Sequence, residues 1–290
     1  MTTITEKAYA KLNLSLDILS RRDDGYHEMR MVMQSISLAD EVTITRREAG
    51  VSVSTNLKYL PCDDRNIAGR AARIFFSRTG IAGGADIVIK KRVPVCSGMA
   101  GGSSDAAAVL RGLCRLYGAP LSGDELRDMG RELGSDVPFC VEGGTVLATG
   151  RGDVLEELTP LPDCTLTICK PYFSISTPEL FSRIRCERIR CRPDTDGLLA
   201  ALENGDLKNI ARRMYNVFED VLPRNASDIG VIKQTLMEHD ALGAVMTGTG
   251  SAVFGLFADP EYAMAARADL RETFDDCFLA FPVKKRPIDV

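Results

Sequence analysis

The sequence PVCSGMAGGSSDAA, residues 94–107, carries the strongest structural signal in this chain of 290 residues. An expected strand, DIVIKKRVPV (86–95), runs into it, and an expected helix begins at Ser103 or Ser104. Glycines at 98, 101 and 102 allow the backbone to approach a ligand, and the helix start adds unpaired N–H donors. The pattern predicts a phosphate-binding loop, although a tight turn without a ligand would use the same residues. It is neither a Walker A motif nor GxGxxG, which argues against a Rossmann dinucleotide site.

Composition narrows the classes of function. The chain is 45% hydrophobic and 26% charged, as globular proteins are, and its length favours two domains. A net charge of -4 provides no basic field for nucleic acid, and no apolar run approaches the roughly 20 residues of a membrane span. Nine cysteines without CxxC spacing predict buried, reduced thiols and a cytoplasmic location. We therefore expect a small-molecule substrate, no nucleic acid and no membrane, in a monomer or weak homodimer.

The order of the expected elements differs between the two halves of the chain. The first half mixes strands and helices: strands at 42–47 and 51–55 joined by a turn at Gly50, a helix over 66–78, and a strand pair at 144–149 and 153–158. The second half, apart from a polar helical insertion ending near residue 222, has the order β-α-β-β-α-β. A turn at Pro160 and Pro162 separates the halves, which predicts an α+β protein with domains 1–160 and 161–290.

Three further motifs carry candidate chemistry. In GSDVPF (134–139), Asp136 occupies an expected turn between a helix and a strand, where an aspartate is either a capping residue or a general base. In AKLNLSL (10–16), Lys11 falls on the polar side of a strand and is either solvated or directed into a cleft. In MTGTGSAVF (246–254), Gly248 either makes a hairpin turn or leaves room for a phosphate.

The lysine-bearing strand, the PxxxGxxGGSS loop, the GxDVP turn and the GTG hairpin together resemble the GHMP kinases, a family of small-molecule kinases. The resemblance covers essentially the whole chain, with the motifs in the family's order. It implies a two-domain α+β fold, in which the N-terminal domain is ribosomal-S5-domain-2-like and the C-terminal domain is ferredoxin-like. It also implies ATP and Mg²⁺, and phosphorylation of a hydroxyl on a small alcohol that carries a cytidine diphosphate.

The resemblance extends to individual residues. Asp136 is the expected general base, and Lys11 is expected to stabilise charge and orient Asp136. The residues expected to bind ATP are Asn66, Pro94, Val95, Cys96, Ser97, Gly98, Met99, Ala100, Gly101, Gly102, Ser103 and Ser104. The residues expected to bind the substrate are Asn13, Tyr26, His27, Thr177, Phe181 and Gly248. Within this set, the rings of Tyr26 and Phe181 are expected to sandwich a cytosine that the backbone of His27 reads.

Some features depart from the family pattern or leave alternatives open. Cys96, Ser97 and Ala100 stand where glycine or leucine is common, which a backbone cradle tolerates unless a position needs positive φ. No dedicated metal cluster is expected, because the cysteines and histidines lack ligand spacing. A GHMP kinase for another alcohol, or a nucleotide-binding regulator without catalysis, remains possible by sequence. The segment around CERIRCRP (186–193) receives no role.

Overall fold

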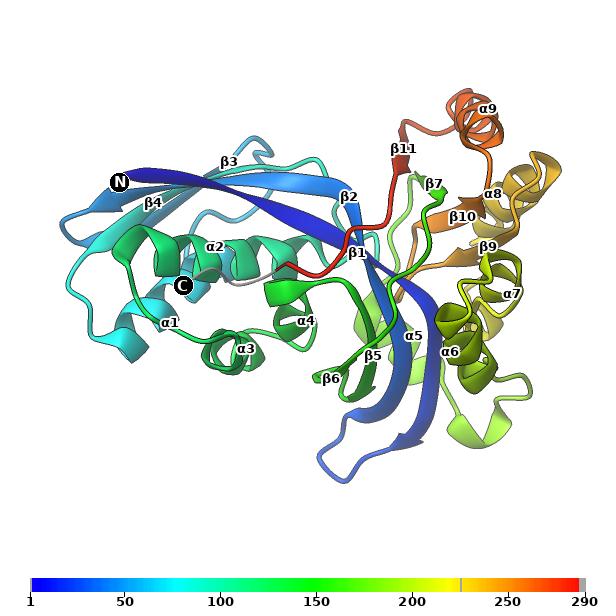
Figure 1. Cartoon of the computed structure of the whole chain (residues 1–290), viewed down its shortest axis with the longest axis horizontal. Coiled ribbons are helices and arrows are strands. Elements are labelled where there is room, and N and C mark those ends of the chain that lie inside the picture. Colours follow the sequence, from blue (N-terminus) through cyan, green and yellow to red (C-terminus); the bar gives the residue numbers. More distant parts are fainter. Residues whose placement is uncertain (1, 225, 287–290) are drawn as a thin grey trace.

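Figure 1 shows the computed structural model of the chain, which describes residues 2–224 and 226–286. The described residues form two β-sheets with helices packed against each. One sheet has seven strands, in the order β3-β4-β2-β1-β8, with β5 paired to β2 and β6 paired to β5. The other has four strands, in the order β11-β7-β10-β9.

The first sheet is built on two long antiparallel strands, β1 (Thr3–Arg21) and β2 (His27–Arg47). Their register shifts between Tyr9 and Lys11 and again between Asn13 and Ser15. Such bulges re-aim side chains and are frequent beside active sites. Two of the three register shifts of this strand pair therefore flank the Lys11 segment, and the third lies between Ile18 and Ser20.

Strand β3 (Gly50–Thr55) confirms the predicted strand and turn, and its pairing adds what the sequence does not predict. It follows β2 after a short turn but pairs in parallel with β4 (Gly84–Lys90), which itself pairs with β2. The turn at Gly50 is present, with φ 79°, but it does not close a hairpin. The pairing is decided by a partner more than thirty residues along the chain, which local turn signals do not reveal.

Helices α1, α2 and α4 pack on the first sheet, and α3 packs against these helices. Helix α1 begins after Asn66, whose side-chain oxygen accepts from the backbone N–H of Ala68, and ends at Gly80 in the left-handed conformation. Helix α3 begins with the predicted capping box of Ser122 and Glu125. The bounds are α1 (Ile67–Thr79), α2 (Gly101–Tyr117), α3 (Gly123–Arg131) and α4 (Val137–Glu142). The alanine-rich faces of α1 and α2, together with apolar residues of α3 and α4, form a core with the first sheet.

The predicted strand pair of the first half is confirmed. Strands β5 (Thr145–Gly150) and β6 (Val154–Glu157) pair antiparallel, and β5 also joins the edge of β2. The sequence predicts that Asp136 lies in a turn between a helix and a strand, but the short helix α4 lies between Asp136 and β5. Pro138 lies in the first turn of α4, where its missing N–H costs no helical hydrogen bond.

The second half folds in the predicted β-α-β-β-α-β order. Its elements are β7 (Thr165–Lys170), α8 (Ser227–Glu238), β9 (Gly243–Met246), β10 (Val253–Phe257), α9 (Pro260–Leu270) and β11 (Asp276–Ala280). The expected insertion contains α5 (Thr177–Arg183), η1 (Cys186–Arg188), α6 (Thr195–Glu203), α7 (Leu207–Arg212), β8 (Tyr215–Asn216) and η2 (Val217–Val221). Strand β8 leaves its own half and pairs in parallel with β1 at Ser15 and Leu16.

The two sheets share apolar core. Leu12 and Leu14 of β1 pack in one cluster with Leu166 and Ile168 of β7 and with Phe254 of β10. Every residue of β7 and β10 is buried, so both faces of these strands are covered. The junction between the sheets is therefore dry and close-packed where it supports the loops of the site.

None of the helices among the described residues is long and apolar enough to cross a membrane. All nine cysteines are free thiols, but Cys62, Cys96 and Cys191 are exposed. The expectation that the thiols are buried is therefore wrong for these three, and it holds for Cys114, Cys164, Cys169 and Cys277.

Candidate active site

Two cavities meet at the glycine-rich loop. The larger, of about 860 Å³, lies toward the second sheet, and the smaller, of about 390 Å³, lies toward α1. Cys96, Gly98, Ala100 and Ser103 line both cavities. A group held at the loop from one side is therefore next to a group bound on the other side.

The smaller cavity collects the residues predicted to bind ATP. Every residue from Pro94 to Ser103 lines it, and so does Asn66. The side chain of Asn66 is already used: its oxygen caps α1, and its nitrogen donates to the carbonyl of Pro61 at 2.8 Å. Ser104, also predicted here, is 1% exposed and donates to the carbonyl of Tyr9 at 2.6 Å. Ser104 therefore fastens α2 to β1, and Ser103 presents its hydroxyl side to the cavities.

The loop backbone is left-handed at three positions. Cys96 has φ 55°, Gly98 has φ 77° and Ala100 has φ 57°. For a residue with a β-carbon this conformation costs about 1–2 kcal/mol. Cys96 and Ala100 therefore hold strained positions where glycine would be relaxed, and such strain is maintained by the surrounding structure.

Helix α2 begins two residues earlier than predicted, at Gly101. Gly101 and Gly102 are helical and are not left-handed, so positive φ is needed before them, not at them. The N-cap residue is Ala100, which has no side-chain oxygen to cap the helix. The first-turn N–H groups of α2 are thus left without the usual side-chain cap, which suits an anion.

The GTG hairpin packs directly against this loop. The backbone N–H of Ala252 donates to the carbonyl of Ser97 at 3.2 Å. A β-carbon on Gly248 would lie 2.7 Å from the Gly98 carbonyl oxygen and 3.2 Å from Lys11 Nζ. Gly248 also lines the larger cavity, as expected of a substrate-side residue. Its lack of a side chain is what allows the hairpin, the loop and the lysine to converge.

Lys11 is 4% exposed, which rules out a solvated lysine on the strand surface. Its Nζ lines the larger cavity and donates to Asn13 Oδ1 at 2.6 Å. Asn13 is fully buried, and its backbone N–H donates to Thr247 Oγ1 at 3.0 Å. Asn13 is not among the residues that line the cavity, so the structure gives it the role of holding Lys11, and its predicted contact with substrate stays a prediction.

Asp136 also lines the larger cavity, at the start of α4. It occupies the N-cap position, but its carboxylate makes no capping hydrogen bond. The same cavity is lined by Lys11. Burial raises the pKa of the nearby Cys140 thiol to about 12, and the charges of Asp136 and Lys11 act on that thiol in opposite directions. Asp136 and Lys11 are thus close enough to influence one group, and the carboxylate remains available to a ligand.

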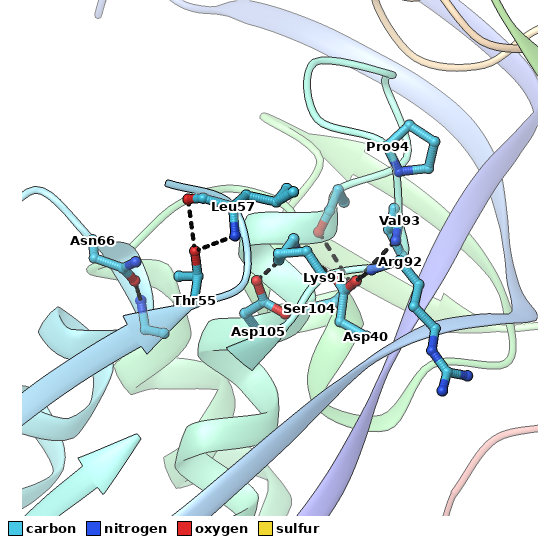
Figure 2. Close-up of polar contacts among 12 residues, drawn as sticks. Asp40, Thr55, Leu57, Asn66, Lys91, Arg92, Val93, Pro94, Ser104 and Asp105 are labelled. Atoms are coloured by element: carbon cyan, nitrogen blue, oxygen red, sulfur yellow. Dashed lines mark hydrogen bonds and ion pairs between the residues drawn. The ribbon is translucent and has the colours of Figure 1, made fainter. Parts of the chain in front are cut away.

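An ion cluster that the sequence did not reveal lies under the smaller cavity (Figure 2). Lys91 Nζ donates to Asp40 Oδ2 at 2.5 Å and to Asp105 Oδ2 at 2.7 Å. Asp40 Oδ1 accepts from the backbone N–H groups of Arg92 and Val93. Burial raises the pKa of Asp105 to about 7, although Lys91 opposes that shift. The cluster ties β2, the end of β4 and the first turns of α2 together.

The substrate-side aromatic residues gather in the larger cavity, but not as a ready sandwich. Tyr26, His27, Thr177 and Phe181 all line it. The Phe181 ring stacks on the His27 ring with centroids 5.1 Å apart. Burial and the charge of Arg21 lower the pKa of His27, which favours a neutral imidazole. A cytosine between Tyr26 and Phe181 would require the Phe181 ring to leave His27.

Arg151 is a site residue that sequence reasoning missed. It lies in the turn between β5 and β6 and lines the larger cavity. Its guanidinium carbon is 4.6 Å from the centre of the Tyr26 ring. It is the one guanidinium among the residues that line this cavity. The sequence GRGD (150–153) by itself indicates only a turn. No neighbouring residue in the sequence indicates that Arg151 would contact Tyr26, which lies on another strand connection.

The described residues contain no group of three or more His, Cys, Asp or Glu side chains placed to hold a metal ion. Any divalent cation at the loop would depend on phosphate oxygens for most of its ligands. A hydroxyl such as that of Ser103 and a carboxylate such as that of Asp136 are the oxygen donors that the cavities offer.

Comparison with known proteins gives the class first. Residues 66–144 match the family model for the GHMP kinases N terminal domain, and residues 198–276 match the model for GHMP kinases C terminal. The fold also resembles the crystal structure of L. major mevalonate kinase in complex with R-mevalonate, with a TM-score of 0.75 at 18% identity over 98% of this chain and 97% of that one. The chain belongs to the GHMP kinase family.

Two relatives with higher sequence identity and one further solved structure are kinases of one kind. The 4-diphosphocytidyl-2-C-methyl-D-erythritol kinase of Caldicellulosiruptor saccharolyticus is 43% identical over 91% of this chain and 92% of the relative. That of Alkaliphilus metalliredigens is 40% identical over 100% of both. A crystal structure of 4-(cytidine 5'-diphospho)-2C-methyl-D-erythritol kinase superposes with a TM-score of 0.83 at 31% identity, covering 96% of this chain and 99% of that one. Within the family, the chain falls among the 4-diphosphocytidyl-2-C-methyl-D-erythritol kinases.

Proposed function

We propose that this chain transfers the γ-phosphoryl group of ATP to the 2-hydroxyl of 4-diphosphocytidyl-2-C-methyl-D-erythritol, in non-mevalonate isoprenoid precursor biosynthesis. The observation that carries the proposal is the meeting of two cavities at one phosphate-type loop, with Lys11 and Asp136 on the larger side. The names of the relatives supply the identity of the two substrates.

ATP binds in the smaller cavity, with its phosphates on the loop. The uncapped first turn of α2 and the left-handed backbone at Cys96, Gly98 and Ala100 direct N–H groups toward an anion. Lys91 is neutralised by two carboxylates, so it does not act as a phosphate-binding lysine. Backbone donors therefore carry most of the phosphate recognition.

Transfer takes place across the loop. Asp136 accepts the proton of the substrate hydroxyl. Its carboxylate, at the N-cap of α4, makes no capping hydrogen bond, which suits that role. Lys11, held at 2.6 Å by Asn13, stabilises charge on the group in transit. Because phosphoryl transfer is largely dissociative, fixing these groups in place matters more than the basicity of Asp136.

Mg²⁺ fits the donor set at this point, because the cavities offer the hydroxyl of Ser103 and the carboxylates of Asp105 and Asp136, and Mg²⁺ commonly completes its shell with phosphate oxygens and water. Ser103 and Asp136 are the residues that would face it. When bound, Mg²⁺ supplies neutralisation of phosphate charge. No protein cage is required.

The cytidine diphosphate occupies the rest of the larger cavity. The backbone of His27 pairs with the cytosine edge, and Tyr26 and Phe181 cover the two faces of the base. Arg151, above Tyr26, is placed to bind the substrate diphosphate, because no other guanidinium lines this cavity. Thr177 Oγ1 lies 2.8 Å from Thr249 Oγ1, and this contact joins α5 to the hairpin at the cavity rim.

The proposal includes the finer organisation of the molecule. We assign domain 1–160 a ribosomal-S5-domain-2-like fold and domain 161–290 a ferredoxin-like fold, supported for the latter by the strand order β11-β7-β10-β9. A cytoplasmic monomer or weak homodimer is consistent with both cavities being lined by one chain and with free thiols at all nine cysteines.

A coupled ATP-consumption assay tests the proposal. The purified protein is given Mg·ATP with the cytidyl substrate, its uridyl analogue, free methylerythritol, mevalonate or homoserine. We expect turnover with the cytidyl substrate far above the others, and ³¹P NMR should show a new phosphomonoester on the product. Equal use of the uridyl analogue would leave a GHMP kinase with another substrate. No turnover with any alcohol, despite ATP binding, would favour the nucleotide-binding regulator.

A further inference from the structure

The segment 183–192, RIRCERIRCR, is the most basic stretch of the chain. It holds five arginines and one glutamate in ten residues, within a chain whose net charge is -4. It begins at the last residue of α5, includes η1 and leads toward α6, the helices between which it runs in Figure 1. All five of its arginines are exposed. The proposed reaction assigns no role to it.

This segment and η2 enclose a cavity of about 490 Å³, called here the arginine pocket. The basic residues that line it are Arg183, Arg185, Arg188 and Arg190. Its apolar lining comes from Ile189, Val217 and Val221. Asp220 is the one acidic residue in the lining, so four positive charges and one negative charge leave a net charge of +3.

The cationic charge of the pocket is largely unneutralised. Arg183 pairs with Glu179 at 2.8 Å, and Arg185 donates to two backbone carbonyls. Among the described residues, Arg188 and Arg190 have no ion pair or side-chain hydrogen bond. Asp220 does not pair with them, because its carboxylate accepts from the Tyr215 hydroxyl at 2.9 Å.

Guanidinium groups gathered around a hollow repel one another unless an anion joins them. Their planar N–H forks match phosphate oxygens in pairs, which makes arginine the usual residue for phosphate recognition. With Asp220 in the lining and Glu179 paired to Arg183, four positive and two negative charges leave a net charge of +2, which complements a terminal diphosphate. The valine and isoleucine side chains add an apolar wall that a bare inorganic ion would not use.

We propose that the arginine pocket is a second ligand site, which binds a small organic diphosphate with a short apolar chain. It shares no lining residue with either cavity at the glycine-rich loop. The site is therefore separate from the proposed reaction and can be occupied while ADP and the cytidyl substrate fill the active site.

Isothermal titration calorimetry tests this, with dimethylallyl diphosphate as the probe and the full-length protein saturated with ADP and cytidyl substrate. We expect one molecule to bind per chain, and binding should weaken as ionic strength rises. Arg188→Gln combined with Arg190→Gln should weaken binding by at least about tenfold, because each removes a charge-assisted contact. Arg212→Gln combined with Arg271→Gln is the matched control, since both arginines are exposed and lie outside the pocket.

Three results would overturn the proposal. One is the absence of binding at millimolar probe. Another is equal binding by wild type and the Arg188/Arg190 variant, provided that circular dichroism shows both to be folded. The third is an equal loss in the Arg212/Arg271 control, which would indicate nonspecific charge attraction. Inorganic diphosphate tests the charged part of the ligand alone, and dimethylallyl alcohol tests its apolar part alone. Both should bind more weakly than dimethylallyl diphosphate. Inorganic diphosphate binding as tightly as the probe would exclude the apolar wall from recognition.

Discussion

Gly98 and Thr247 meet backbone to backbone, so that a β-carbon on Gly98 would lie 2.1 Å from the Thr247 carbonyl oxygen. The contact presses the glycine-rich loop against the hairpin of the second sheet. It fixes the loop at the point where the two cavities meet, and it makes Gly98 the position of the loop with least tolerance for a side chain.

Gly98→Ala should therefore damage both stability and nucleotide binding. The left-handed φ alone costs about 1–2 kcal/mol, and the clash is with backbone that cannot rotate away. Thermal unfolding should show a lower Tm, and the KM for ATP should rise. Gly102→Ala is the control for stability, because its β-carbon would meet only Ile67 Cγ2 at 3.5 Å. An unchanged Tm in Gly98→Ala would mean that the loop and hairpin are not packed as described.

Asp136→Asn should leave Tm close to wild type, since the carboxylate makes no capping hydrogen bond. Turnover should fall by about 10²–10⁴-fold, the usual loss when a general base is removed. KM values for both substrates should change little. Steady-state kinetics check this, with Asp128→Asn as the control on an exposed aspartate that pairs only with Arg131. If Asp136→Asn keeps wild-type turnover, Asp136 is not the general base.

Tyr26→Ala should raise the KM for the cytidyl substrate severalfold to about a hundredfold, because stacking on a base contributes roughly 1–3 kcal/mol. The KM for ATP should stay nearly constant. Tyr59→Ala provides the control, since Tyr59 is 72% exposed and lines neither cavity. A parallel rise in both KM values would indicate a general loss of structure, contrary to a local role in base binding.

Arg151→Gln should raise the KM for the cytidyl substrate without lowering the affinity for ATP. The reason is that the amide keeps part of the side chain over Tyr26 but loses the charge offered to the substrate diphosphate. Arg131→Gln, on an exposed helix turn, is the control. Retention of the wild-type KM by Arg151→Gln would place the diphosphate elsewhere in the cavity.

Asp105 should make stability depend on pH. Burial raises its pKa from 3.8 to about 7, so between these values the unfolded chain is ionised while the folded chain holds the proton. The folded state then binds more protons, and the contribution of Asp105 becomes less favourable as pH rises toward 7. The Tm of Asp105→Asn relative to wild type should therefore be higher at pH 8 than at pH 5. Calorimetry at the two values checks the sign, and a pH-independent difference would contradict the raised pKa.

Local signals in the sequence were sufficient for much of the fold. The capping box at Ser122 and Glu125 and the stop at Gly80 use residues a few positions apart, and both are confirmed. The order of elements in the second half, β-α-β-β-α-β, is also confirmed. The predicted start of α2 at Ser103 or Ser104 is wrong, because serines normally cap helices, and the short helix α4 is not predicted by the sequence.

The missed parts of the site depend on contacts between distant residues. Lys91 donates a hydrogen bond to Asp40, which is 51 positions away in the sequence. Neither lysine nor aspartate indicates by its type that it has a buried partner. The positive φ of Cys96 and Ala100 arises from the packed loop, since their side chains favour the opposite sign. Arg151 reaches Tyr26 only because β5 pairs with β2.

The pairing of β8 with β1 has a mechanical consequence. Asn216, in β8, donates through its side chain to the carbonyls of Met246 and Gly248, both at 2.8 Å. Strand β1, which carries Lys11, is thus paired with β8 from the second half of the chain, and β8 is hydrogen-bonded to the hairpin. These segments lie over a shared apolar core. A rotation of one half against the other would break these hydrogen bonds and expose the shared core to water. The hydrogen bonds of Asn216, the pairing of β8 with β1 and the shared core therefore oppose a hinge movement of one half of the chain against the other.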